Sequence, residues 1–456
     1  MANILLIPLC IILFSLGSSM VEISKFSIRE ATVEDTKLAF KQNRVTSRQL
    51  VDFYLEEIQK LNPILNAVIE VNPDALALAD EADRERKAQK PESQLGLAGT
   101  PIILKDNIAT KDKLNTTAGY YALLGSIVPQ DAGVKHFGSI LCPANANSVV
   151  GIKPTVGLTS RAGVVPFSAP QDTVGAVSDA VHVLDAIVGY DPDDAASGGV
   201  SRYIPKGGYS QYLKHDGVKG KRLGIMRYSF AGFGNNSQLL ETYKPHLRTL
   251  RQRGAVLVDI VDTSNFDILT ATMFSNQQKA MSVEFKQAIN TYLKQLVTSQ
   301  VRSLADLISF NKKFSKLATM EWDHLRHNGV MLLKCYLQEK LKEYGQDIFE
   351  ASQKTKGIGV KEKLARLNIS KASKDGFEKL MKENKLNALV TPNFNIYYFL
   401  SARGYPGINV PAGYDSNGIP YGITFGGLKG WETKLIEIGY AFDQATRSGS
   451  LLHLAI

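Results

Sequence analysis

A strand–helix–strand pattern in the middle of this 456-residue chain restricts its possible folds more than any other feature. An apolar run, Arg222–Met226, precedes a helical pattern near Leu239–Gln252, and Gly254 then leads into a second apolar run, Val256–Ile260. Two short strands joined by one helix are typical of a β-α-β unit. Pro245 lies inside the helical pattern and is expected to kink or split it. The chain is therefore predicted to be α/β, with a parallel or mixed sheet wrapped by helices.

The N-terminal part shows local signals for two helices and a strand. Thr46 to Gln49 fits a capping box, and the apolar face that follows predicts a helix ending before Pro63. Ala67–Val71 is predicted as a short strand. Asn72 and Pro73 predict the start of a helix that continues to about Lys90, with proline in its first turn.

The remaining elements are predicted from hydrophobic periodicity. They are a buried strand at Pro101–Leu104, a mostly helical stretch at Phe266–Glu383, a strand at Ala388–Val390, and a glycine- and proline-rich loop with short strands at Gly404–Gly427. These elements extend the sheet beyond the β-α-β unit and place helices around it.

Composition excludes several classes of protein. Hydrophobic residues make up 44% of the chain and charged residues 21%, which is typical of a soluble globular protein. The formal net charge of +9 is spread along the chain without basic runs interleaved with aromatics, so no nucleic-acid partner is expected. Three cysteines, Cys10, Cys142 and Cys335, form no disulfide framework and no metal-ligand spacing, and His324 and His327 lack a third ligand. No metal and no cofactor are predicted.

The N-terminus carries a targeting signal. The apolar run Ile4–Phe14, followed by small residues at Gly17–Ser19, has the length of a signal-peptide core and is short for a bilayer span. Residues 1–20 are predicted to be a signal peptide, with a signal anchor as the alternative. The mature chain is then expected in the secretory pathway or outside the cell, without stable membrane insertion. Sequons at Asn115, Asn235 and Asn368 fit that compartment.

Two segments contain residues that could take part in catalysis. Lys105 ends the apolar run Pro101–Leu104, where partial desolvation lowers a lysine's pKa toward the range in which a neutral amine accepts protons. A plain charge at the end of a strand is the alternative reading of Lys105. Ser139 follows Gly138, whose missing side chain lets nearby backbone amides approach an oxyanion. A glycine–serine pair alone indicates little.

Taken in order, five segments give a specific pattern: Gly96–Asn107, Gly138–Ala144, Gly151–Leu158, Ser168–Gly175 and Gly404–Pro411. This pattern resembles the amidase signature family from about Ile28 to Ala445. The resemblance implies amide hydrolysis by a Ser–Ser–Lys triad that contains no histidine. It further implies that Ser139 is the nucleophile and Lys105 the general base. It also implies that the oxyanion-hole amides are those of His136, Phe137 and Gly138.

The chain departs from the family pattern at the third triad member. The bridging serine belongs to a Gly-Ser-Ser-x-Gly loop, and no such loop lies between Lys105 and Ser139. Asp131–Val134 runs almost directly into Ser139, where the family has a long stretch of strands and helices. A shorter gap occurs at Gly175 and Ala176. We expect an internal deletion that leaves the core incomplete, assigns no residue as bridging serine, and makes residues 130–137 irregular.

The expected organisation has five parts: a signal peptide (1–20), an N-terminal helical segment (25–92), the amidase core (93–265, deleted between about 134 and 137), a helical flank (266–383) and a C-terminal part of the core (384–456). Two functions remain open. One is a hydrolase of small-molecule carboxylic amides, impaired by loss of the bridging serine. The other is an inactive product on the same fold, either a splice form, a gene-model artefact or a binding protein. The transamidating A subunit shares these motifs, but a secretory signal argues against it. Substrate identity and oligomeric state are not predicted.

Overall fold

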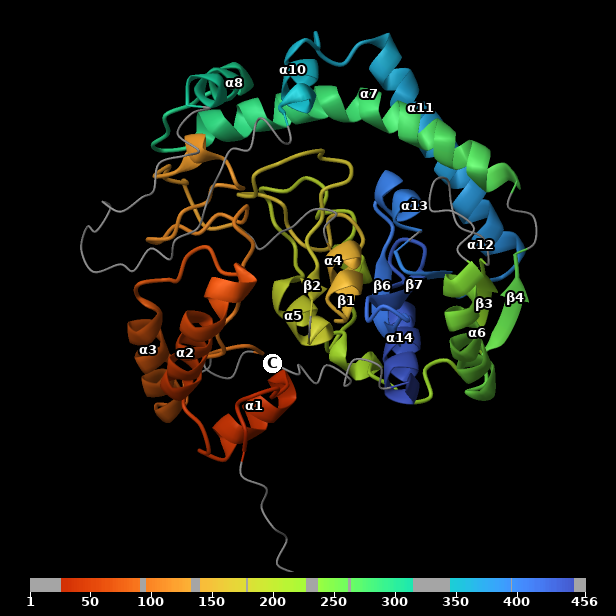
Figure 1. Ribbon diagram of the computed structural model, residues 1–456, viewed down its shortest axis with the longest axis horizontal. Coiled ribbons are helices and arrows are strands. Elements are labelled where there is room, and N and C mark those ends of the chain that lie inside the picture. The colour runs from red at the N-terminus through yellow and green to blue at the C-terminus, as the bar shows by residue number, and fades with distance from the viewer. Residues whose placement is uncertain are drawn as a thin grey trace, which may run out of the picture.

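A computed structural model describes residues 26–90, 96–132, 140–177, 179–226, 237–260, 264–314, 345–394 and 396–446. Its centre is a mixed seven-stranded sheet in the order β2-β1-β6-β7-β5-β3-β4 (Figure 1). The strands are β1 (Gly151–Lys153), β2 (Ala176–Val177), β3 (Arg222–Ile225), β4 (Val256–Asp259), β5 (Ala388–Pro392), β6 (Gly407–Tyr414) and β7 (Pro420–Gly426). Pairing is parallel between β5, β3 and β4 and antiparallel elsewhere in the sheet. The prediction of an α/β fold with a mixed sheet is confirmed.

The β-α-β unit predicted from the sequence is present as β3, α6 (Ser237–Gln252) and β4. Arg222 is in register with Val256, so the two strands run parallel, as a crossover through a helix requires. Pro245 lies within α6, which remains one helix across that position, so the proline does not split it.

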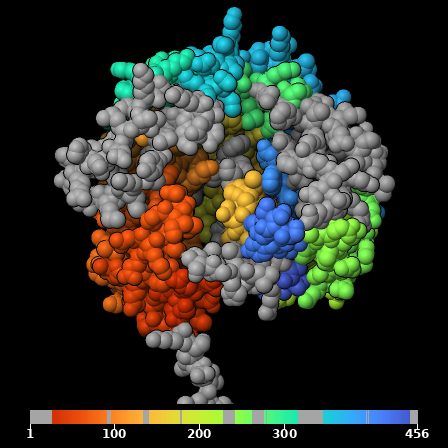
Figure 2. Space-filling view, in the orientation of Figure 1, coloured from red at the N-terminus to blue at the C-terminus, as the bar shows by residue number. Residues whose placement is uncertain are grey.

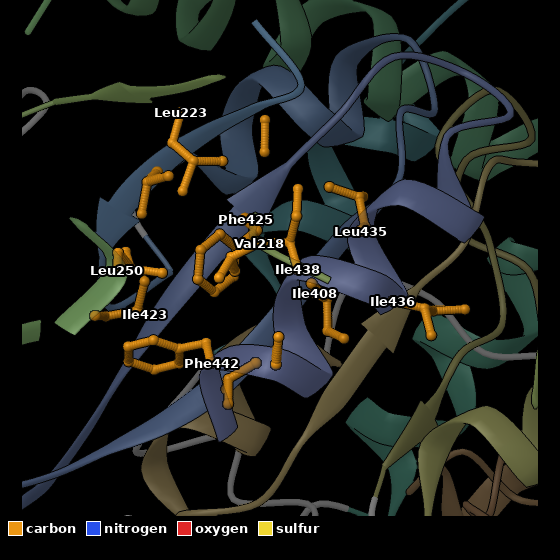
Figure 3. Packing of buried hydrophobic residues seen from close by; sticks show 14 of the residues in the cluster. Val218, Leu223, Leu250, Ile408, Ile423, Phe425, Leu435, Ile436, Ile438 and Phe442 are labelled. Atoms are coloured by element: carbon orange, nitrogen blue, oxygen red, sulfur yellow. The ribbon is translucent and has the colours of Figure 1, made fainter. Parts of the chain in front are cut away.

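Helices cover both faces of the sheet. On one face lie α5 (Ala180–Ile187), α6 and α14 (Glu432–Thr446). Figure 3 shows Ile408 of β6 and Ile423 and Phe425 of β7 against Ile438 and Phe442 of α14. Alternate residues of a strand point to opposite faces, so these side chains share one face of the sheet and form its largest cluster of buried aliphatic and aromatic groups.

The opposite face packs against α4 (Leu141–Ala146) and α13 (Tyr397–Ala402), with Leu141, Leu389 and Leu400 in one buried cluster. Behind them, α7 (Ser264–Gln295) crosses the whole molecule along its upper rim (Figure 1). The shorter helices beside it are α8 (Leu304–Lys313), α10 (Asp347–Gln353), α11 (Val360–Ser373) and α12 (Lys379–Glu383). Within the described part of 266–383 no strand occurs, which confirms the predicted helical stretch there.

The N-terminal helices are α1 (Val33–Lys41), α2 (Ser47–Leu65) and α3 (Ala75–Lys87). The predicted capping box is confirmed: Thr46 accepts from the Gln49 backbone amide, and the Gln49 side chain accepts from the Thr46 amide. The predicted end before Pro63 is wrong, because α2 continues to Leu65. A proline so near the C-terminal end removes only one backbone hydrogen bond of the helix.

The strand predicted at Ala67–Val71 does not form. Asn62, buried near the end of α2, accepts hydrogen bonds from the Ala67 and Val68 amides at 2.8 Å each and donates to the Val68 carbonyl at 2.8 Å. One side chain thus uses backbone groups that a strand would present to a neighbour. The next helix, α3, starts at Ala75 rather than at Pro73.

The loop with short strands predicted at Gly404–Gly427 is instead the central antiparallel hairpin of the sheet, β6 and β7. Ile408, Val410 and Ala412 alternate with more polar residues and are buried against α14. Most of the glycines and prolines that suggested a loop lie at or just beyond the ends of the strands, or at a register shift between Pro411 and Gly413, and Gly422 lies inside β7. Tertiary burial outweighs the local turn signals here.

Candidate active site

The segment that carries Lys105 does not form the buried strand predicted from its apolar sequence. Residues 101–105 have no regular secondary structure, and Ile102, Ile103 and Leu104 are 53%, 79% and 41% exposed. An extended apolar segment is buried only where a neighbouring strand or helix covers it. Among the described residues nothing does so at this place, which explains the failed prediction.

Lys105 itself is exposed, although neighbouring protein atoms on one side desolvate its ammonium and lower its pKa below the ordinary lysine value. The chain after it is firmly held. The Lys105 carbonyl accepts from the Ile108 amide at 3.0 Å, and the Ala109 amide donates to the Gly163 carbonyl at 3.1 Å. The Val165 amide donates to the Asn107 carbonyl at 3.0 Å. Residues 105–109 are thereby joined to the segment that follows β1.

The predicted nucleophile Ser139 and the predicted oxyanion-hole residues His136, Phe137 and Gly138 lie outside the described residues. The roles that the resemblance implies for these four residues therefore remain predictions. Of the predicted junction 130–137, only residues 130–132 are described, and they form neither helix nor strand.

Helix α4 begins two residues after Ser139. Its residue Asn145 is buried, and its Oδ1 accepts a hydrogen bond from the Gly422 amide of β7 at 2.7 Å. A side chain at Gly422 would overlap Asn145 Oδ1 and Asn409 Oδ1, so glycine is required at this close approach. In Figure 2 the surface is hollowed between the N-terminal residues, in orange and red, and the yellow residues of α4.

Asp106 fixes the chain around Thr117, downstream of Lys105. Its carboxylate accepts from the Thr117 amide at 2.9 Å, from the Thr117 hydroxyl, and from the Gly119 amide at 3.2 Å. Thr116 is also buried, and its hydroxyl has no hydrogen-bond partner among the described residues. Neither threonine forms a hydrogen bond with Lys105 among the described contacts. The Thr117 proton is directed to Asp106, so Thr117 is poorly placed to replace the bridging serine.

A second polar cluster joins the segment Ser168–Gly175 to the helical flank. The Asp172 carboxylate accepts from the Ser168 amide, and burial raises the pKa of Asp172 to about 6. The Ser168 hydroxyl donates to Glu284 of α7, whose other oxygen pairs with Arg366 of α11 at 2.7 Å. No local sequence pattern marks Glu284 or Arg366 as a partner, because each lies more than a hundred positions beyond Ser168.

Lys153 of β1 is the described lysine whose pKa is lowered furthest, to about 7, because it is fully buried. Its Nζ donates to the Tyr405 carbonyl at 2.6 Å and to the Pro154 carbonyl at 3.2 Å. Nearby, Glu432 accepts from the Thr155 amide at 2.7 Å, and burial raises the pKa of its carboxyl. Lys153 lies in the matched segment Gly151–Leu158, but it is enclosed, and its hydrogen bonds indicate a role in tying β1 to the loop before β6.

No group of three or more potential metal-binding side chains occurs in the described ranges, and His324 and His327 lie outside them. Nor do those ranges contain a helix long and apolar enough to cross a membrane. A cavity of about 330 Å³ opens beside α7 and is lined by Val283, Lys286, Gln287, Asn290, Thr355, Lys356 and Gly357. It contains none of the predicted catalytic residues.

Comparison with known proteins identifies the scaffold. The amidase family model matches residues 49–137 and 137–436, two segments that meet at residue 137. A probable amidase of Arabidopsis thaliana is 45% identical over 97% of this chain and 96% of its own length, and a putative amidase of Schizosaccharomyces pombe is 28% identical over 93% and 86%. The native peptide amidase from Stenotrophomonas maltophilia superposes with a TM-score of 0.78 at 28% identity, covering 92% of this chain and 97% of its own. The chain therefore belongs to the amidase signature family of hydrolases.

Proposed function

We propose that this chain carries the machinery of a hydrolase for carboxylic amide C–N bonds, with Ser139 as nucleophile and Lys105 as general base, and that loss of the bridging serine impairs it. The observation that carries the proposal is the family match, which breaks at residue 137, two positions before Ser139. The alignment with the Arabidopsis relative supports the same deletion. It spans 520 positions, whereas this chain has 456 residues, so many positions of the relative have no counterpart here.

The reaction requires a path for one proton. Ser139 Oγ attacks the amide carbonyl carbon while its proton moves toward Lys105 Nζ, and the backbone amides at 136–138 stabilise the oxyanion. The amine then leaves with a proton supplied by Lys105, and water releases the acyl group from Ser139 by the reverse sequence of proton transfers. In a Ser–Ser–Lys triad the middle serine relays the proton. Without it, transfer depends on direct contact between Lys105 and Ser139.

The environment of Lys105 supports the proposal that this lysine is impaired as a general base. A lysine acts as a base only when its amine is neutral, and desolvation is what lowers its pKa toward that state. Lys105 is exposed here, and its pKa is lowered by one-sided desolvation alone. The segment before it, Pro101–Leu104, is uncovered, as expected when neighbouring strands are missing. A catalytically inactive product, such as a splice form, a gene-model artefact or a binding protein on this fold, is the second candidate. The same exposed segment favours it.

Localisation is part of the proposal. Residues 1–20 act as a secretory signal peptide, and the chain is not stably inserted in the membrane after that peptide is cleaved. N-terminal sequencing of the protein purified from a eukaryotic host tests this directly. A mature N-terminus near residue 20 supports the proposal, and an intact Met1 contradicts it.

The catalytic assignment is tested by single variants. Purified chain is assayed with small primary amides and anilides, beside Ser139→Ala, Lys105→Met and the matched control Lys111→Met, which changes another exposed lysine. We expect weak hydrolysis that disappears in Ser139→Ala and Lys105→Met and persists in Lys111→Met. Weak hydrolysis that survives Ser139→Ala refutes the assignment of the nucleophile. If the parent chain shows no hydrolysis above background, the inactive product is favoured. Sequencing the transcript across codons 131–139 then distinguishes a real deletion from a gene-model error.

A further inference from the structure

The outer face of α11 carries exposed apolar side chains. Helix α11 packs beside α7 at the rim of the molecule (Figure 1). Its residues Ala365 and Ile369 are buried, whereas Val360, Leu364 and Leu367 are 83%, 54% and 65% exposed. Residues three and four positions apart lie next to each other on a helix, so the last three side chains form one apolar stripe, the α11 stripe. Exposed apolar side chains that lie together usually mark a surface that another group covers.

A glycosylation sequon, Asn368-Ile369-Ser370, lies beside the α11 stripe. Asn368 follows Leu364 by one helical turn, so the two side chains are neighbours on the helix surface. Asn368 and Ser370 are both partly exposed, whereas Ile369 between them is buried. The two side chains that define the sequon are therefore accessible in the folded chain, and the asparagine lies next to the stripe.

The sequon at Asn115 has different surroundings. Asn115 Nδ2 donates to both carboxylate oxygens of Glu70, at 3.1 and 3.3 Å, and its Oδ1 accepts from the Gly125 amide at 2.9 Å. Thr117, the hydroxyl residue of this sequon, is buried. A sugar on Asn115 Nδ2 would occupy the space in which the Glu70 carboxylate lies, so a glycan there is incompatible with the described contacts. The third sequon, at Asn235, lies outside the described residues.

We infer that Asn368 carries an N-linked glycan that covers the α11 stripe, and that Asn115 stays unmodified. The inference rests on the proposed entry of the chain into the secretory pathway. The sugar donor there is an oligosaccharide linked to a lipid diphosphate. A bond forms between Asn368 Nδ2 and the first sugar carbon, the bond from that carbon to the diphosphate breaks, and Nδ2 loses one proton. A glycan is bulky and solubilising, so it shields the apolar side chains beside it.

Mass spectrometry of the full chain secreted by a eukaryotic host tests the site. Peptide N-glycosidase F converts each glycosylated asparagine to aspartate, so peptide mapping assigns every sequon separately. We expect this conversion at position 368 and none at Asn115. Asn368→Gln and Ser370→Ala should lose the glycan at this position, because each removes one side chain of the sequon. Ser370→Thr is the matched control and should keep the glycan, since threonine supplies the same hydroxyl.

Binding of a hydrophobic fluorescent dye tests the covering role. Enzymatic removal of the glycan from the folded chain should increase dye binding. The double variant Leu364→Gln, Leu367→Gln should lack this increase, because it has no apolar stripe to expose. Circular dichroism verifies that each protein is folded. Dye binding that does not change on removal of the glycan overturns the covering role.

N-terminal sequencing of the same secreted sample separates the two proposals. A chain that is cleaved near residue 20 but unmodified at Asn368, or modified at Asn115, overturns the inference while the proposed localisation stands. An intact Met1 together with an unmodified Asn368 overturns both.

Discussion

The hydrogen bond between Asn145 and Gly422 fixes α4 against the sheet, and its removal gives a defined loss of stability. Asn145 Oδ1 accepts from the Gly422 amide at 2.7 Å in a buried place, beside a register shift in the β6–β7 pair. Asn145→Ala removes the acceptor and leaves a buried amide without a partner. A buried unpaired donor costs about 1–3 kcal/mol. We expect the free energy of unfolding to fall by about that amount.

Asn147 provides the matched control on the same stretch of chain. It is exposed, and its side chain donates to the Pro143 carbonyl at 2.8 Å, a contact that water can replace. Asn147→Ala should change stability by less than about 0.5 kcal/mol. Urea unfolding followed by intrinsic fluorescence gives both free energies, provided that the dependence of the free energy of unfolding on urea concentration is the same in both variants. Equal losses in the two variants, or no loss in Asn145→Ala, would refute the argument that this single bond anchors the helix after Ser139.

Three further perturbations test other parts of the structure by urea unfolding. The pKa of Lys153 is about 7 in the folded chain, below its value in the unfolded chain, so the unfolded chain binds more protons between these two values. The free energy of unfolding should therefore rise by about 2 kcal/mol from pH 7 to 9. Lys153→Met should lack this increment, and an identical pH dependence in both proteins would contradict the prediction. Arg366→Met leaves the buried Glu284 carboxylate without its ion-pair partner and should cost about 1–3 kcal/mol, whereas an unchanged midpoint would show that the pair contributes nothing. Phe425→Ala should lower the free energy of unfolding by about 3–5 kcal/mol, because the ring is fully buried against α14. Ile419→Ala, at an exposed position, should lower it by less than about 0.5 kcal/mol, and similar losses in the two variants would be inconsistent with the described core.

Local sequence signals predicted the parts of the fold whose cause is local. The Thr46 capping box is complete within four residues, and the β3-α6-β4 unit needs only hydrophobic periodicity and one helix between two strands. The family pattern likewise depends on short runs of residues. These features could be predicted because the interactions that stabilise them join positions close in sequence.

The failed predictions share a different physical cause. Pro101–Leu104 has the composition of a buried strand, but a strand needs a neighbour, and no local pattern shows whether the neighbour is present. Ala67–Val71 does not form the predicted strand, because the side chain of Asn62 accepts hydrogen bonds from the Ala67 and Val68 amides. In each case, whether the segment forms a strand depends on residues outside it that contact it.

The candidate site was only partly predictable for the same reason. Lys105 and Ser139 are proposed from their motifs, because each motif is local, and their roles stay predictions. The Ser168–Glu284 hydrogen bond joins residues 116 positions apart, and the bond between Lys153 and the Tyr405 carbonyl spans 252 positions. Neither Glu284 nor Tyr405 carries a sequence feature that marks it as a partner. Only the packing of the helical flank and the central hairpin brings them together.

We propose that the missing segment, and not the residues that remain, limits amide hydrolysis by this chain. The measurement compares this chain with a variant in which the segment of the Arabidopsis relative that has no counterpart here is inserted at residue 137, where the family match breaks, with Ser139 kept. Turnover of a small anilide should rise by about 10²–10⁴-fold, the usual contribution of acid–base catalysis, and should again be lost in Lys105→Met. Turnover by the unmodified chain at the rate of the Arabidopsis relative, abolished by Ser139→Ala, would contradict the claim.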